Sequence, residues 1–289
     1  MIETVTTDLP TAVGSKGKPK TILVTGATGY VGGRLVRELL SHEYKVRVLV
    51  RNAHRLNDYS WQSSVEIVEG DANDENALDQ AMDGVQIAYY LLHALNSKDD
   101  FVSQERQLAT KFGEVAKKNE LERIIYLGGL AKADSPLSQH LGARQETGEI
   151  LRASGVPTAE LRAGIVLGSG SASFEMLRHL TERLPIMVTP KWVNNRIQPI
   201  AIRDVLRYLV GCCTLPNEIN RSFDIGGPDI LTFKEMMIQF AEEAGLPKRR
   251  IYPIPVMTPK LASGWIGLVT PVPVTLAKRL VSSLKNEVL

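Results

Sequence analysis

Three glycines, Gly26, Gly29 and Gly32, recur at every third residue between an apolar run and an amphipathic stretch. Glycine allows a tight turn at the first position, a close approach of phosphate at the second, and close packing of helix on strand at the third. A helix that begins in such a turn presents backbone N–H groups and the positive end of its dipole to an anion. We therefore predict that this turn binds the pyrophosphate of a dinucleotide, through Gly26, Thr28, Gly29, Tyr30, Val31 and Gly32.

An arginine stands at the position that decides which dinucleotide fits. The second apolar run, residues 46–50, is followed directly by Arg51. Sites for NAD usually carry Asp or Glu there, which bonds the ribose 2′-hydroxyl and would repel a 2′-phosphate. Arg51, together with Arg34 of the first helix, suits a phosphate that a guanidinium can bind in bidentate fashion. The sequence favours NADP(H) over NAD(H), with a solvated loop charge as the alternative for Arg51.

Strands and helices must alternate to position these residues. Short apolar runs rich in β-branched residues predict buried strands at 20–25, 46–50, 65–68, 85–92, 123–127 and 158–162. Helical spacing predicts helices after the glycine turn, from Asp74, from Asp99 or Asp100, and over about 140–154. This rhythm requires right-handed crossovers and predicts an α/β doubly wound parallel-sheet Rossmann fold, whose ligand lies beyond the carboxyl ends of the strands.

The regular alternation of strands and helices becomes less clear after residue 165, which suggests a division of the chain. We expect a disordered arm at 1–18, an NAD(P)-binding Rossmann core at 19–165, and a smaller substrate or capping lobe at 166–289, partly integrated with the core. Within that lobe the patterns predict helices at 174–184, 203–213 and 233–244 and strands at 196–202 and 222–225.

Composition excludes several classes of protein. The chain is 44% hydrophobic and 23% charged, with a net charge of +2 and interleaved signs, so a nucleic-acid-binding face is not expected. The only two cysteines, Cys212 and Cys213, are adjacent, which favours neither a disulfide nor a metal site. We interpret them as a buried helical pair in a reducing, cytoplasmic compartment.

One apolar segment, residues 261–277, carries no charge and is followed by Lys278 and Arg279. It is shorter than the ~20 residues of a membrane span and contains two prolines. We expect it to pack on the protein or in an interface, and membrane association through residues 261–279 is the alternative.

The sequence resembles a known family in several places. Thr25-Gly-Ala-Thr-Gly-Tyr-Val-Gly-Gly33 resembles the opening of the extended and atypical short-chain dehydrogenase/reductases, including the NmrA-like proteins. Gly70-Asp71 resembles the family's adenine-contacting pair, and residues 198–205 and 223–228 resemble two later landmarks, so that the likeness runs over residues 19–245. It implies a Rossmann fold, a nicotinamide cofactor and, often, hydride transfer to a carbonyl or an enone. We expect further cofactor contacts from Asp71, Ala72, Leu92 and His93.

The sequence departs from the catalytic residues that the resemblance implies. The family uses a Tyr-x-x-x-Lys on the helix after the fifth strand and a Ser at the end of that strand. Here Gly128 and Gly129 end the strand, and the helix begins His140-Leu-Gly-Ala-Arg144. Imidazole can donate a proton near neutral pH, so His140 is a candidate acid, whereas Arg144 stays charged and suits a ribose hydroxyl. The alternative is two solvated residues at the start of a helix.

Three functions remain open at this point. The first is an NADP(H)-dependent atypical oxidoreductase acting on a small carbonyl or enone. The second is a non-catalytic NADP(H)-binding redox sensor or structural protein, which the missing Tyr, Lys and Ser would fit. A nucleotide-sugar epimerase or dehydratase ranks third, because such members normally keep the Tyr and the Lys. A small-molecule substrate is expected in the first case, and a homodimer through the helix at 99–119 and the helix after the fifth strand is an open possibility.

Overall fold

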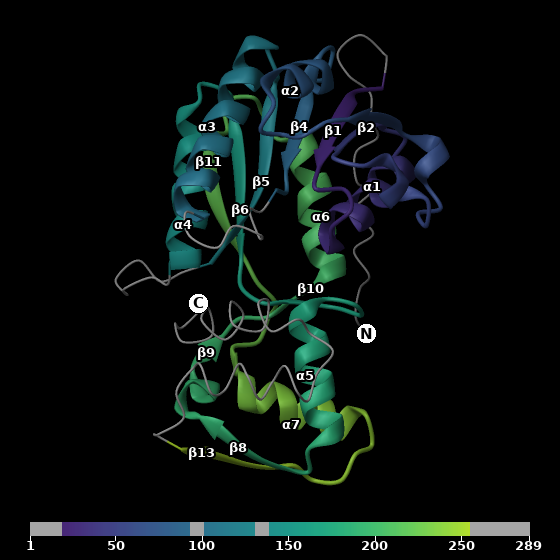
Figure 1. Cartoon of the computed structure of the whole chain (residues 1–289). Coiled ribbons are helices and arrows are strands. Elements are labelled where there is room, and N and C mark those ends of the chain that lie inside the picture. The colour runs from purple at the N-terminus through teal and green to yellow at the C-terminus, as the bar shows by residue number, and fades with distance from the viewer. Residues whose placement is uncertain (1–18, 93–100, 131–138, 255–289) are drawn as a thin grey trace, which may run out of the picture. The chain divides into compact units, whose positions relative to one another are not determined.

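The computed structural model describes residues 19–92, 101–130 and 139–254, over which strands and helices alternate (Figure 1). Seven strands form one sheet in the order β11-β6-β5-β4-β1-β2-β3. Their bounds are β1 (Thr21–Thr25), β2 (Lys45–Val50), β3 (Glu66–Glu69), β4 (Ile87–Tyr90), β5 (Arg123–Gly129), β6 (Thr158–Ala163) and β11 (Arg221–Ile225). The neighbours β1 and β2, β2 and β3, β1 and β4, and β4 and β5 all pair in parallel. The predicted doubly wound Rossmann fold is confirmed.

Helices cover both faces of this sheet because parallel strands need long crossover connections. Figure 1 shows α2, α3 and α4 on one face and α1 and α6 on the other. Between the sheet and α2 and α3 lies an apolar core, in which the ring of Tyr90 contacts that of Phe112 at 5.0 Å. The helix bounds are α1 (Tyr30–Ser41), α2 (Glu75–Met82), α3 (Phe101–Lys118), α4 (Gln139–Ala153) and α6 (Ile202–Gly211).

The chain forms two compact units. Of the described residues, the first unit holds 19–92, 101–128, 146–161 and 206–223, and the second holds 129–130, 139–145, 162–205 and 224–254. The second unit contains α5 (Ala172–Arg183), α7 (Phe233–Glu243) and three small sheets. These sheets pair β7 (Val166–Leu167) with β10 (Ile200–Ala201), β9 (Arg196–Ile197) with β12 (Leu231–Thr232), and β8 (Ile186–Pro190) with β13 (Arg250–Ile254).

Two expectations for the later elements need correction. The predicted strand at 196–202 is two short strands, β9 and β10, which belong to different sheets. Gln198 and Pro199 separate them: the Gln198 side chain donates to the carbonyl of Gly227 at 2.7 Å, and the Pro199 carbonyl accepts from the Gly227 N–H at 2.8 Å. The strand predicted at 222–225 within the small lobe is β11, an edge strand of the large sheet.

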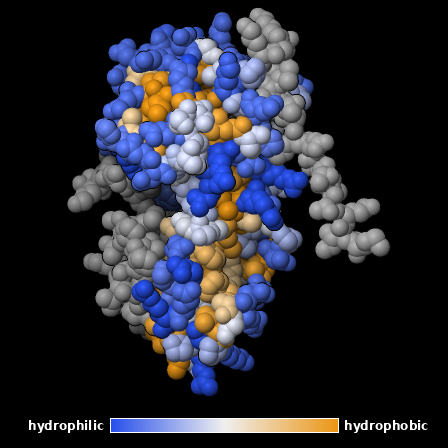
Figure 2. Space-filling model, turned by 90° about the vertical axis from the view of Figure 1, so that its right-hand side faces the viewer, coloured by the Kyte–Doolittle hydropathy of each residue, from blue (hydrophilic) through white to orange (hydrophobic). Residues whose placement is uncertain are grey.

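Several sequence-based expectations fall outside the described residues. They concern the arm at 1–18, His93, the cap at Asp99 or Asp100, and the apolar segment at 261–277. Among the helices that are described, none is long and apolar enough to cross a bilayer. Figure 2 shows one face of the molecule, on which hydrophilic residues surround hydrophobic patches.

The two cysteines lie in a short 3-10 helix, Cys212–Thr214, that follows α6, and both are free and buried. The hydroxyl of Tyr89 donates to the carbonyl of Leu209 at 2.8 Å and lies 3.0 Å from the Cys213 sulfur. Burial raises the pKa of Cys212 to about 12 and that of Cys213 to about 11.

Both thiols are therefore expected to resist alkylation in the folded protein. Only the thiolate reacts, and at pH 8 its fraction falls from about 25% for an ordinary thiol to about 0.1% or less at these raised pKa values. A time course with a thiol reagent at pH 8 should show labelling at least about 100-fold slower in buffer than in guanidinium chloride. Rapid stoichiometric labelling of the folded protein would contradict this burial.

Candidate functional site

A pocket of about 460 Å³ lies in the first unit, at the carboxyl ends of β4, β1, β2 and β3. The connection from β1 leads towards β2 and β3, whereas β4 begins the other half of the sheet. This reversal opens a crevice at the strand ends, which is where open α/β sheets bind ligands. The lining residues are Gly26, Thr28, Gly29, Leu49, Val50, Arg51, Asn52, Arg55, Gly70, Asp71, Ala72, Asn73, Leu91, Leu92, Gln104 and Leu108.

Two of the three glycines in the turn are required by the chain's own packing. Gly26 has a φ of +72°, and a Cβ there would lie 2.4 Å from the carbonyl oxygen of Leu91. A Cβ on Gly32 would lie 2.2 Å from the carbonyl oxygen of Gly26, so this glycine lets α1 approach β1. Both glycines therefore build the turn, whatever the turn binds.

Gly29 has a different role. Its backbone is extended, with φ −85° and ψ 170°, and a Cβ would make a tight contact of 3.1 Å with the Gly26 carbonyl oxygen. It is exposed, lines the pocket and is the N-cap of α1, with no side chain capping the helix. The first turn of α1 also contains no acidic residue. The positive end of the helix dipole thus faces the pocket without a side chain in between, which fits a phosphate group.

Thr25 holds the two strands that flank the reversal at a fixed distance. Its buried hydroxyl donates to the carbonyl of Tyr89 at 2.7 Å and accepts from the N–H of Leu91 at 3.3 Å. The ends of β1 and β4 therefore form one rigid edge of the pocket.

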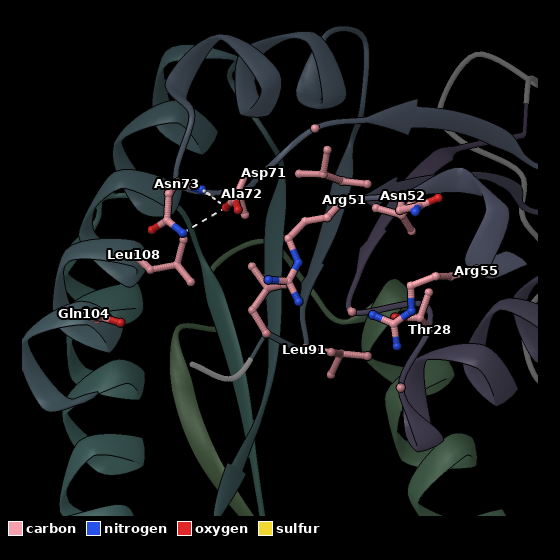
Figure 3. Close-up of a pocket in the computed structure, with 16 residues that line it drawn as sticks. Thr28, Arg51, Asn52, Arg55, Asp71, Ala72, Asn73, Leu91, Gln104 and Leu108 are labelled. Atoms are coloured by element: carbon pink, nitrogen blue, oxygen red, sulfur yellow. Dashed lines mark hydrogen bonds between the residues drawn. The ribbon is translucent and has the colours of Figure 1, made fainter. Parts of the chain in front are cut away.

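Two arginines, Arg51 and Arg55, line the opposite part of the pocket after β2. Figure 3 shows the side chain of Arg51 pointing into the pocket. Arg55 lies on η1 (Ala53–Leu56), a short 3-10 helix whose first turn is capped by Asn52, which accepts from the N–H of His54 at 2.9 Å. Among the described residues, no carboxylate pairs with either guanidinium. Two cations without a carboxylate partner in a concave site attract an anion.

Arg55 was not identified from the sequence. The signal for it was the Asn at position 52, a residue that commonly caps the first turn of a helix. In a 3-10 helix, residues three positions apart lie on the same side. Arg55 therefore lies on the same side as Asn52, which also lines the pocket.

The wall after β3 is partly polar and partly apolar. Asp71 accepts from both the backbone N–H and the side-chain amide of Asn73, at 2.8 and 2.9 Å, which fixes this turn (Figure 3). Ala72, Leu92 and Leu108 supply apolar surface on the same pocket. A wall with a carboxylate and apolar side chains suits a flat base with exocyclic N–H groups.

The remaining predicted cofactor residues have other positions. Tyr30, Val31, Gly32 and Arg34 are not among the residues that line the pocket. The Arg34 guanidinium lies 4.0 Å from the centre of the Tyr30 ring, and its Nη1 donates to the Tyr30 carbonyl at 3.1 Å. Gly26, Thr28, Gly29, Arg51, Asp71, Ala72 and Leu92 do line the pocket.

The two catalytic candidates lie in the second unit, on the first turns of α4. Arg144 lies beside the end of β5, since a Cβ on Gly129 would be 3.4 Å from both Cδ and Nε of Arg144. The glycine at this strand end therefore leaves room for the arginine side chain. The catalytic use of His140 and Arg144 stays a prediction.

The chain is similar to known proteins in both sequence and structure. A model described as the NmrA-like family matches residues 18–252. A Streptomyces griseus protein named (4-alkanoyl-5-oxo-2,5-dihydrofuran-3-yl)methyl phosphate reductase is 28% identical over 235 residues, covering 79% of this chain and 75% of that protein. A ceramide reductase from Caulobacter vibrioides is 24% identical over 196 residues, and the match covers 68% of this chain but spans only 61% of that protein's length.

The solved structure of a Citrobacter triphenylmethane reductase, complexed with NADP(H), is similar with a TM-score of 0.71. The two chains are 21% identical, and the likeness covers 93% of this chain and 91% of that chain. At this level of identity the similarity shows that the two chains share a fold.

Proposed function

Because the chain belongs to the NmrA-like family, we propose that it is a reductase that binds NADP(H) in the pocket of the first unit and acts on a small carbonyl or enone. One observation carries the proposal: Arg51 and Arg55 line the same pocket as the uncapped N-terminus of α1. The pocket thus offers two separate places for anions, which is what a pyrophosphate and a 2′-phosphate on one molecule require.

Each part of the nucleotide has a proposed partner in the pocket. Gly29 and the start of α1 hold the pyrophosphate, and Arg51 and Arg55 hold the 2′-phosphate. The adenine lies against Asp71, Ala72 and the leucines of the apolar wall. When bound, the nicotinamide supplies the hydride. The Citrobacter structure with NADP(H) and the reductase names of the relatives support this assignment.

The residues at the start of α4 are the proposed acid and the proposed ribose or substrate contact. His140 replaces the usual tyrosine as proton donor, and Arg144 supplies a fixed positive charge beside the end of β5. Because arginine cannot lower its charge by releasing a proton, it binds and orients but does not relay protons.

The decisive experiment compares NADPH with NADH in the Arg51→Gln, Arg55→Gln double variant. Charge-assisted hydrogen bonds are worth about 1.5–3 kcal/mol each, so losing one from each arginine should raise the Kd for NADPH by at least about 100-fold. The Kd for NADH should change by less than about threefold, because NADH has no 2′-phosphate. Fluorescence titration of the purified protein measures both constants.

Two single variants complete the series. Arg37→Gln removes an exposed charge of α1 that does not line the pocket, and should change neither constant. Arg34→Gln tests the arginine expected from the sequence, whose side chain folds back onto Tyr30. An equal loss of NADPH and NADH affinity in the double variant would rule out a 2′-phosphate site at Arg51 and Arg55.

A second candidate function is a redox sensor or structural protein that holds NADP(H) without turning it over. The observation that favours it is a departure from the usual catalytic residues of the family. Gly128 and Gly129 end β5 where the family has Ser, and His140 and Arg144 stand where it has Tyr and Lys. The two functions can be separated by washing the purified protein and measuring the retained nucleotide by mass spectrometry. Nucleotide that does not exchange, with no turnover in a carbonyl and enone screen, would favour the sensor over the reductase.

A further inference from the structure

Most of the connection between β2 and β3, residues 51–64, carries both arginines and is held in place by the chain around it. It contains η1 and a second 3-10 helix, η2 (Gln62–Ser64). The N–H of Ala53 donates to the Glu69 carboxylate at 3.2 Å, and the Leu56 side chain is completely buried. We call residues 51–64 the arginine segment.

Tyr59 connects the arginine segment to the glycine turn. Its hydroxyl donates to the carbonyl of Thr28 at 3.1 Å. Its ring lies over Gly33, where a Cβ would be 2.7 Å from the Tyr59 Cε1. The glycine at position 33 thus makes room for this ring.

Trp61 makes a second connection, to the first turn of α1. Its indole N–H donates to the carbonyl of Gly33 at 3.0 Å, and the side chain is buried. The rings of Tyr59 and Trp61 are in contact, with centres 4.7 Å apart. The two aromatic side chains therefore hold a carbonyl before α1 and a carbonyl within its first turn.

These contacts fix the two proposed anion sites relative to each other. Thr28 and Gly29 belong to the turn proposed for the pyrophosphate, and Arg51 and Arg55 belong to the arginine segment. The distance between a pyrophosphate and a 2′-phosphate on the same nucleotide is limited by covalent geometry. A site that presets this distance spends less of its binding free energy on ordering side chains and loops.

We propose that Tyr59 and Trp61 are positioning residues that set the preference of the pocket for a 2′-phosphorylated dinucleotide, a role that rests on the proposed function. Neither residue lines the pocket. They act through the placement of Arg51 and Arg55 relative to the glycine turn. NADH needs only the turn, so its affinity depends less on the two aromatic contacts.

The test uses Tyr59→Phe, which keeps the ring and removes only the hydroxyl, and Trp61→Phe, which keeps an aromatic ring but removes the indole N–H together with part of the indole. A neutral hydrogen bond contributes about a factor of two to ten, so losing both should raise the Kd for NADPH by at least about fourfold. The Kd for NADH should rise by less than about twofold. Tyr208→Phe, which removes an exposed hydroxyl on α6, is the matched control and should leave both constants unchanged.

A double-mutant cycle separates positioning from a general loss of stability. If Tyr59 acts through the arginines, Tyr59→Phe should have almost no further effect on NADPH in the Arg51→Gln, Arg55→Gln background. A full effect in that background, or an equal loss for NADPH and NADH, would overturn the positioning role. A wild-type protein that binds neither nucleotide, or both equally, would instead overturn the proposed function itself and the inference with it.

Discussion

A Gly29→Asp variant is expected to fold normally and to lose its affinity for NADPH. Gly29 is the N-cap of α1, has an extended backbone that any residue adopts, and is exposed. Aspartate is among the preferred N-cap residues, because its carboxylate accepts from the N–H groups of the first turn. The same carboxylate occupies the place proposed for a phosphate, so stability and binding should change in opposite directions. The close contact with Gly26 limits the gain in stability.

The expected size of the effect follows from the repulsion of two anions. Two unit charges 4 Å apart cost about 4 kcal/mol at an effective dielectric constant of about 20. This corresponds to a roughly 1000-fold change in Kd, which solvent screening reduces, so we expect at least about a 100-fold loss of NADPH affinity. NADH should lose as much, because both nucleotides contain the pyrophosphate.

The matched control is Gly29→Asn, which has the same size and is also a good N-cap but carries no charge. It measures the steric part of the effect, and we expect its loss of affinity to be at least about tenfold smaller than that of the aspartate variant. Thermal unfolding and fluorescence titration give the two readouts. If the aspartate variant still binds NADPH with nearly wild-type affinity, the pyrophosphate does not lie at the start of α1.

The architecture of the large sheet could be predicted because its causes are local. Each buried strand is a short apolar run, and the helix start at Asp74 is a side-chain cap that accepts from the Asn76 N–H. The short strands of the second unit have no such local cause. β9 and β10 have two residues each, and each of these residues pairs with a partner 34 or 36 positions away in the sequence.

The candidate site divides in the same way. The glycine turn could be predicted because the backbone leaves no room for a side chain at Gly26 and Gly32. Only glycine fits there, so the spacing of the glycines in the sequence indicates the turn. The contribution of Arg55 depends on a short 3-10 helix, and a helix of this length has too few residues for a periodic pattern. The contacts of Tyr59 and Trp61 join residues 31 and 28 positions apart, so no local pattern indicates them.

The second large effect concerns Arg123, a charged residue that is only 1% exposed. It begins β5, and its guanidinium donates to the carbonyls of Ile219, Leu215 and Pro216 at 2.9, 3.2 and 2.6 Å. These three carbonyls belong to the connection that leads into β11. The arginine therefore holds the edge strand of the large sheet to the start of β5.

Arg123→Met is expected to lower the free energy of unfolding by about 3 kcal/mol. Hydrogen bonds from a charged donor are worth about 1.5–3 kcal/mol each, and part of the loss is recovered because water can reach a connection at the surface. Arg221→Met, which removes an exposed arginine of β11, should change stability by less than about 0.5 kcal/mol. Urea unfolding of both variants measures the difference.

The Arg123 variant should also separate stability from binding. Arg123 stands at the amino end of β5, whereas the pocket lies at the carboxyl ends of β4, β1, β2 and β3. The fraction that remains folded should therefore bind NADPH with the wild-type Kd. A raised Kd under conditions where the variant is fully folded would mean that the edge strand and the pocket are coupled through the sheet. An unchanged free energy of unfolding would mean that water replaces the guanidinium at all three carbonyls, because only full rehydration removes the cost of losing a buried donor.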